Sequence, residues 1–109
     1  MSIIKIYSCN DSRGVRPMWT AEEMGLEYES VMMPFPPRFF HKEFMDVNIL
    51  GTIPYLIDGE VEMTESVAMC QYLVDLYGPT DLKVTSDEQD YHHFLNWLAH
   101  SDATLTFPQ

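Results

Sequence analysis

The side chains best suited to do chemistry in this chain stand close together near its beginning, where Cys9 is followed by Ser12 and Arg13. They come after the apolar run 3–7, which predicts a buried strand, and just before a helix predicted to start at Val15. A cysteine beside a helix N-terminus and an arginine tends to have a lowered thiol pKa, so Cys9 is a candidate for forming a mixed disulfide with a small thiol. No second cysteine completes a Cys-x-x-Cys motif, which excludes a dithiol cycle. The plain alternative is that Cys9 is a small buried residue.

A second group of candidate residues lies in the stretch 51–66. Ile53 precedes Pro54, and an X-Pro bond is the only kind that readily becomes cis; a cis bond would turn the backbone N–H and C=O of Ile53 outward, toward an extended ligand. Glu65 and Ser66 fall in the first turn of a predicted helix, whose unpaired N–H groups and partial positive charge suit a carboxylate. Taken alone, a glutamate there is equally well explained as a partner of the helix dipole. Together, the two halves predict one site for an extended ligand.

The elements that must position these residues follow from apolar periodicity and from the turn residues between the apolar runs. We expect, in order, a strand over 3–7, a helix from Val15 to Met24, a strand from Tyr28 to Met33, a short irregular helix from Phe39 to Val47, two short strands joined at Asp58–Gly59, and a helix from Thr64 to Tyr77 capped by Thr64. The first two strands should be parallel and the hairpin antiparallel. This order, βαβ-α-ββα, predicts an α/β domain with a mixed four-stranded sheet, of the thioredoxin-like type.

Residues 34–37, which follow the second strand, include three prolines. Because proline lacks an N–H donor, we expect a stiff connector that cannot begin a regular helix at once.

The last part of the chain predicts a linker and one more helix. Residues 79–90 are polar and read as a linker that ends a first domain at 1–78. Beyond it, 91–103 forms an amphipathic helix with Tyr91, Phe94, Leu95 and Leu98 on one face. We expect this face to act as a contact surface, so that the chain self-associates or the helix folds back on its own domain.

Histidines on this last helix suggest a metal site at first sight. His93 and His100 lie seven residues apart on one helical face, and His92 is adjacent. No acidic or cysteine partner completes a ligand set at fixed spacing, so we expect no metal.

Composition and charge limit the classes of protein to which this chain can belong. The chain has 109 residues, 46% of them hydrophobic, and a formal net charge of -11. The acids concentrate in 44–109, which holds eleven acids against Lys83 alone. Such a surface repels polyanions, so we expect neither a nucleic-acid nor a membrane partner. The N-terminus lacks the basic start and apolar stretch of a signal peptide, and there are only two cysteines, so we expect a cytoplasmic protein with reduced thiols.

Five separated motifs occur in the order found in the glutathione transferases. The chain resembles the N-terminal, glutathione-binding half of that family, of the bacterial serine or cysteine type, through these segments: Ser12 to Arg16, Glu22 to Leu26, Phe44 to Leu56 (FMDVNILGTIPYL), Asp58–Gly59, and Glu65–Ser66. The resemblance covers residues 3 to about 78. It implies a transferase that binds glutathione as co-substrate, adds its thiolate to a small electrophile, and forms a homodimer when intact.

The resemblance also implies roles for individual residues. Ser12 matches the serine or cysteine that stabilises the glutathione thiolate, although serine is also an ordinary helix N-cap. Ile53 with Pro54 would pair with the peptide, and Glu65 with Ser66 would hold its γ-glutamyl end. Arg38 and Lys42 are the bases placed to reach the glycine carboxylate, although solvated surface charge explains either of them as well.

Two other functions stay open beside the transferase. One is a glutathione-dependent thiol reductase or peroxidase that works through Cys9, and the other is a non-catalytic binding module with the same fold. The resemblance further implies that 91–109 opens an all-helical second domain, which in the family makes most of the electrophile pocket. We therefore expect this chain to correspond to a transferase cut just past that helix, with little activity by itself.

Overall fold

The computed structural model describes residues 3–103, which form a mixed four-stranded sheet with the strand order β2-β1-β3-β4. The strands are β1 (Ile4–Cys9), β2 (Tyr28–Met33), β3 (Tyr55–Asp58) and β4 (Val61–Met63). The helices are α1 (Val15–Glu23), α2 (Pro37–Phe40), α3 (Phe44–Val47), α4 (Ser66–Tyr77) and α5 (Tyr91–Ala103). Strand β1 runs parallel to β2 and antiparallel to β3, and β3 with β4 is an antiparallel hairpin. The predicted α/β class and sheet are confirmed.

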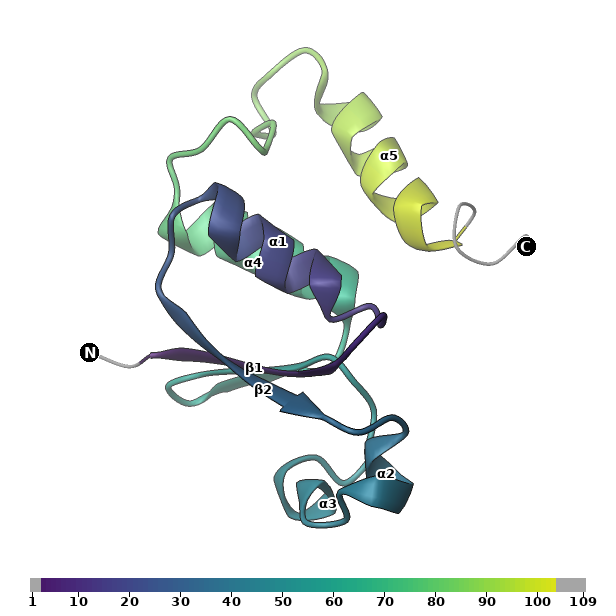
Figure 1. Ribbon diagram of the computed structural model, residues 1–109. Helices are drawn as coiled ribbons and strands as arrows, with labels where there is room; N and C mark the ends of the chain where they lie inside the picture. Colours follow the sequence, from purple (N-terminus) through teal and green to yellow (C-terminus); the bar gives the residue numbers. More distant parts are fainter. Residues whose placement is uncertain (1–2, 104–109) are drawn as a thin grey trace.

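Helices α1 and α4 lie side by side over one face of the sheet, whereas α2 and α3 lie beyond the far end of β2 (Figure 1). Helix α5 lies on the other side of the α1 and α4 pair, away from the sheet, and a long connection joins it to α4. The chain therefore places the end of β1, the start of α1 and the start of α4 at one end of the molecule, with the last turn of α5 nearby.

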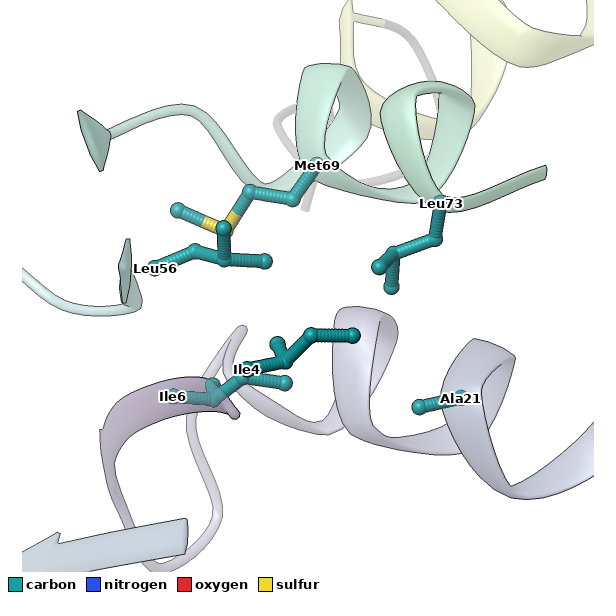
Figure 2. Close-up of a cluster of buried hydrophobic side chains, with 6 residues drawn as sticks. All are labelled: Ile4, Ile6, Ala21, Leu56, Met69 and Leu73. Carbon is teal, nitrogen blue, oxygen red and sulfur yellow. The ribbon is translucent and has the colours of Figure 1, made fainter. Parts of the chain in front are cut away.

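The main core lies between the sheet and the helices α1 and α4. Figure 2 shows side chains from β1, β3 and both helices pointing into this space: Ile4, Ile6, Ala21, Leu56, Met69 and Leu73, all of them buried. Burial of such aliphatic side chains is the main stabilising contribution to a fold of this size. On the opposite face of the sheet, a second cluster consists of Cys9, Met33, Phe44 and Tyr55. The alternation of the two faces along β1 follows from the two-residue period of a strand.

The region between β2 and β3 differs from the prediction, because the expected single helix from Phe39 to Val47 is two short helices. Helix α2 begins at Pro37 and ends at Phe40, because the next residue, His41, has a φ of -145° and a ψ of 69°, which are not helical. Helix α3 then carries Phe44, which is 1% exposed, into the second core. The expectation that the proline run cannot begin a helix is also wrong. Pro37 occupies the first helical position, where a missing N–H costs nothing.

The start of α4 differs from the prediction as well. The helix begins at Ser66 instead of Thr64, and its cap residue is Glu65, with an extended backbone and no side-chain hydrogen bond to the helix. The Thr64 hydroxyl donates to the Glu65 carboxylate at 3.1 Å instead of capping the helix. The N-terminus of α4 therefore has no side-chain cap, and Ser66 is the first residue of the helix.

Candidate functional site

An open cleft of about 560 Å³ lies where β1 ends and α1 begins. Three segments line it: the turn before α1, the connector after β2, and the loop before β3. The lining residues are Asp11, Ser12, Arg13, Val15, Arg16, Phe35 and Ile53. Of the eight residues predicted from the sequence, Ser12 and Ile53 therefore share one cleft, although they are far apart in the sequence.

Ser12 is held in the cleft by three neighbours. Its hydroxyl donates to the Cys9 carbonyl at 2.7 Å, and its Oγ accepts from the Gly14 N–H at 3.3 Å. The Ser8 hydroxyl lies 3.1 Å from the same atom. Gly14 allows this approach, because a Cβ at position 14 would stand 1.7 Å from the Ser8 Oγ. Ser12 is thus a half-exposed hydroxyl whose oxygen is fixed by the backbone of the turn.

The turn that presents Ser12 contains an unusual backbone conformation. Asp11 has a φ of 56°, in the left-handed region that residues other than glycine rarely adopt. The residue is exposed, and it lines the cleft. Left-handed residues are common at ligand-binding turns, where the surrounding structure holds them.

Cys9 stands in an environment that opposes thiolate formation. Its side chain is 2% exposed, and its thiol donates to the Pro34 carbonyl at 3.7 Å. Burial raises the pKa of this thiol, contrary to the lowered pKa that its position beside a helix start suggested. Cys9 packs in the second core with Phe44 and Tyr55, so the geometry favours its interpretation as a small buried residue.

The loop before β3 carries Ile53 and Pro54, and the bond between them is cis. Pairing of β1 with β3 ends at Tyr7 and Tyr55, so Ile53 lies outside that register, and it lines the cleft. Pro54 itself is fully buried.

Asn48 shapes this loop, although no role was predicted for it from the sequence. Its side-chain amide donates to the Thr52 carbonyl at 2.9 Å, and its Oδ1 accepts from the Leu50 N–H at 3.1 Å. Asn48 is 4% exposed. The signal for it was present in the FMDVNILGTIPYL segment, where an asparagine ahead of Gly51 is a turn former.

Ser66 and Glu65, the predicted carboxylate-binding pair, have different environments. Ser66 is 8% exposed, and its Oγ accepts a hydrogen bond from Arg16 Nη1 at 3.0 Å. Glu65 is exposed on the neighbouring surface. Because Arg16 also lines the cleft with Ser12, its guanidinium connects the cleft to the start of α4. Sequence reasoning missed this role of Arg16, which depends on packing between residues 50 positions apart.

Arg38 and Lys42 are both exposed, on α2 and in the turn after it. Neither is among the residues that line the cleft. The Arg38 Cβ lies close to Gly51, so the side chain starts near the loop that carries Ile53.

The remaining features of the described chain do not extend this site. Within residues 3–103, no group of three or more histidine, cysteine, aspartate or glutamate side chains is arranged to hold a metal ion. The rings of His92 and His93 lie 3.9 Å apart, and His100 contacts Trp97. None of the helices in the same range is both long enough and apolar enough to span a membrane.

Comparison with known proteins gives the family. Residues 2–75 match the model described as the glutathione S-transferase N-terminal domain. The chain belongs to the glutathione S-transferase family. The match covers the sheet and α1 to α3 together with most of α4, and it confirms the family predicted from the sequence.

Individual relatives agree with this assignment. Glutathione S-transferase 3 of Schizosaccharomyces pombe is 26% identical over 103 residues, which are 94% of this chain and 43% of that protein. A glutathione transferase homolog from Drosophila mojavensis, solved with bound glutathione, has a TM-score of 0.78 at 25% identity and covers 94% of this chain and 48% of that one. The solved beta-etherase LigF from Sphingobium has a TM-score of 0.76 at 28% identity, covering 92% and 42%. This chain spans less than half the length of these three relatives.

Proposed function

We propose that this chain binds glutathione in the cleft at the β1–α1 junction and stabilises its thiolate through Ser12, for addition to a small electrophile. In this proposal Ile53 pairs with the peptide backbone and Glu65 with Ser66 holds the γ-glutamyl end. The observation that carries the proposal is the continuity of the site, because Arg16 lines the Ser12 cleft and donates to Ser66. The Drosophila mojavensis homolog with bound glutathione supports the choice of ligand.

The chemistry requires a hydrogen-bond donor for sulfur. The thiol of glutathione must lose its proton to become a nucleophile, and a donor that stabilises the thiolate lowers its pKa. The Ser12 hydroxyl can turn from the Cys9 carbonyl to a sulfur atom while the Gly14 N–H still holds its oxygen. The thiolate then forms a bond to carbon of the electrophile, and the electron pair leaves with a leaving group or moves into a conjugated acceptor.

The positions of the charged residues fit a tripeptide with two carboxylates. Arg13 and Arg16 line the cleft in a chain whose net charge is -11, so the positive potential is local. We also propose that Arg38 or Lys42 meets the glycine carboxylate; the Arg38 side chain starts near Gly51, in the loop that carries Ile53 and Pro54.

The organisation of the whole protein is part of the same proposal. We infer that residues 1–78 form the glutathione-binding unit, that 79–90 is a linker, and that α5 opens a helical second domain that contributes to the electrophile pocket and to a homodimer. The exposure of Leu95 and Trp97, 41% and 62%, supports a helix with surface left for further contacts.

Calorimetric titration with glutathione tests the binding proposal. We expect saturable binding by the unaltered chain and a loss of about tenfold in affinity for Glu65→Ala combined with Ser66→Ala, because each removes a polar contact to a charged group. Lys83→Gln, at a residue that pairs with Asp75 and does not line the cleft, serves as the control and should bind normally. Unchanged affinity in the double variant would place the site elsewhere.

A further inference from the structure

Exposed apolar side chains gather in the part of the chain between β2 and β3. Helix α2, helix α3 and the loop before β3 meet at Gly51, where a Cβ would stand 3.1 Å from the Arg38 Cβ and 2.7 Å from the Met45 sulfur. In residues 35–50, six large apolar side chains each expose more than a third of their surface: Phe35, Phe39, Phe40, Met45, Ile49 and Leu50. We call these six residues, together with Arg38 and Lys42, the α2 patch.

The α2 patch lies on a projecting part of the molecule. Figure 1 shows α2 and α3 beyond the far end of β2, whereas α5 and the connection before it lie on the opposite side of α1 and α4. Neither α5 nor that connection therefore covers the patch. Exposed apolar patches on a globular domain commonly mark an interaction surface.

The patch carries positive charge in a chain that is otherwise acidic. Residues 34–42 contain two bases and no acid, so the rest of the chain has a net charge of -13, against -11 for the whole. Within residues 3–103, three of the other four bases pair with acids, whereas Arg38 and Lys42 form no ion pair. The adjacent Glu43 carboxylate lies 3.5 Å from His41. A surface that complements the patch is therefore both apolar and anionic.

The two phenylalanines of α2 project in different directions. Consecutive residues of a helix are rotated by about 100° around its axis, yet Phe39 and Phe40 are both 67% exposed. A helix that binds in a protein groove presents residues three or four positions apart along one face. Rings exposed around a projecting turn suit a deformable partner instead, such as the headgroup region of a bilayer, which can surround them.

We propose that the α2 patch docks on the surface of an anionic phospholipid bilayer, with Phe39 and Phe40 among the headgroups and with Arg38 and Lys42 beside the lipid phosphates. Aromatic side chains that enter the headgroup region and bases that attract anionic lipids together give reversible binding to such a surface. The inference goes beyond the proposed function and does not depend on it. Its tests contain no glutathione, because Arg38 or Lys42 also serves the glycine carboxylate in that proposal.

The position of the patch answers the objection that the whole chain is acidic. The net charge predicts repulsion from an anionic membrane, and on that ground we expected no membrane partner. Charges separated by more than the Debye length, about 8 Å at physiological salt, are largely screened. The acidic connection at 79–90 lies at the other end of a molecule that measures 46 by 40 by 20 Å (Figure 1). A bilayer in contact with the patch therefore interacts mainly with Arg38 and Lys42.

Sedimentation with vesicles tests the docking. We expect the unaltered chain to bind vesicles of equal parts phosphatidylcholine and phosphatidylglycerol, and to bind vesicles of phosphatidylcholine alone at least tenfold more weakly, about the effect of two bases near an anionic surface. Binding should fall when salt rises from about 0.1 M to about 1 M, because the Debye length shrinks from about 10 Å to about 3 Å. Equal binding to both kinds of vesicle, or binding to neither, would overturn the proposal.

Paired variants test whether the α2 patch itself makes the contact. Phe39→Gln combined with Phe40→Gln should weaken vesicle binding at least about tenfold, since two apolar rings are lost. Trp97→Gln removes a similarly exposed aromatic side chain from α5 and should bind normally. Lys42→Gln should weaken binding about fivefold, whereas Lys83→Gln, at a residue paired with Asp75, should not. Circular dichroism checks that each variant is folded. Losses as large in the controls would contradict the assignment to this patch.

Quenching by brominated lipid tests whether the rings of α2 enter the bilayer. The chain has two tryptophans, so Phe39→Trp combined with Trp19→Phe and Trp97→Phe leaves one tryptophan, in the patch. We expect its fluorescence to shift to shorter wavelength on anionic vesicles and to be quenched by phosphatidylglycerol brominated on its acyl chains. Binding without quenching would show adsorption through the bases alone and would overturn the insertion of the rings. A chain that binds glutathione but no vesicles would overturn this inference and leave the proposed function standing.

Discussion

At the scale of single residues, the two sequence candidates for thiol chemistry are separated by burial. Cys9 and Ser12 lie three positions apart, yet Cys9 packs in the core while Ser12 faces the cleft. The last residues of a strand alternate between faces of the sheet, and the following turn carries Ser12 back toward α1. The position of Cys9 beside the start of a helix predicted a reactive thiol. The sequence could not show that Pro34 and Phe44 cover this side chain.

The raised pKa of Cys9 predicts slow reaction with thiol reagents. Because burial raises the pKa of this thiol and limits access, alkylation of the folded chain near pH 8 should be at least about tenfold slower at Cys9 than in the denatured chain. A Cys70→Ser variant isolates the reaction at Cys9, and mass spectrometry follows it. Rapid, complete alkylation of the folded variant would contradict the buried position and revive the reductase hypothesis.

At the scale of elements, the hairpin and α4 are joined by a buried carboxylate. Asp58, 7% exposed at the end of β3, accepts hydrogen bonds from Tyr72 at 2.7 Å and from Tyr77 at 2.5 Å. Charged hydrogen bonds of this kind stabilise a fold by about 1.5–3 kcal/mol each. This contact holds α4 over the sheet, and with it the position of Ser66.

Removal of one of these hydroxyls should lower stability measurably. We expect Tyr72→Phe to lower the free energy of unfolding by about 1–3 kcal/mol, because it removes a hydrogen bond to a buried carboxylate and keeps the ring. Urea denaturation measures the change. Tyr91→Phe, whose ring lies on α5, is the matched control and should change stability by less than about 0.5 kcal/mol. Equal stability of Tyr72→Phe and the unaltered chain would refute this role of Asp58.

The same contact predicts how stability depends on alkaline pH. Burial and the hydrogen bond to Asp58 raise the pKa of Tyr72 to about 12, and the hydrogen bond to Asp58 followed by burial raises that of Tyr77 to about 12. A raised pKa means that folding favours the protonated phenol. The two phenols therefore contribute fully to the stability of the fold below the ordinary pKa of 10.0, and this contribution to stability is lost as pH rises toward 12.

An absorbance titration of the phenolates should show this delayed ionisation. We expect Tyr72 and Tyr77 to ionise well above pH 10 or together with unfolding. Simultaneous ionisation of every tyrosine near pH 10, with the fold intact by circular dichroism, would contradict it.

The predictable parts of the fold were those set by local pattern. The strand Tyr28–Met33 and the helix from Val15 agree with the structure to within one residue, because apolar periodicity decides them. The split between α2 and α3 was not predictable in this way, since it depends on anchoring Phe44 in the second core. The hydrogen bonds of Arg16 to Ser66 and Asp102 were equally hidden, because no local pattern relates these three residues.

At the scale of the whole molecule, α5 is tied to the domain by few contacts. No residue of this helix is buried, although Phe94 and Leu98 face α4 across a cavity of about 290 Å³. A larger neighbouring cavity of about 410 Å³ separates Leu98 from Trp19 on α1. Leu95 and Trp97 of α5 are exposed apolar side chains, which can contribute to association with another chain.

We therefore expect the 109-residue chain to self-associate through α5. Light scattering over increasing concentration should show a rising mean mass, and Trp97→Gln should reduce it. Phe39→Gln removes an equally exposed aromatic side chain from α2 and serves as the control, so it should leave the association through α5 in place. A strict monomer at all concentrations would show that these exposed side chains are no contact surface.

The central claim is that the cleft activates glutathione through Ser12, and a pH titration of the thiolate absorbance of bound glutathione tests it most directly. We predict that the thiol ionises at a lower pH when bound than when free, that Ser12→Ala removes most of this shift while binding persists, and that Cys9→Ala keeps it. A shift that survives Ser12→Ala and disappears in Cys9→Ala would contradict this account and would assign the chemistry to Cys9.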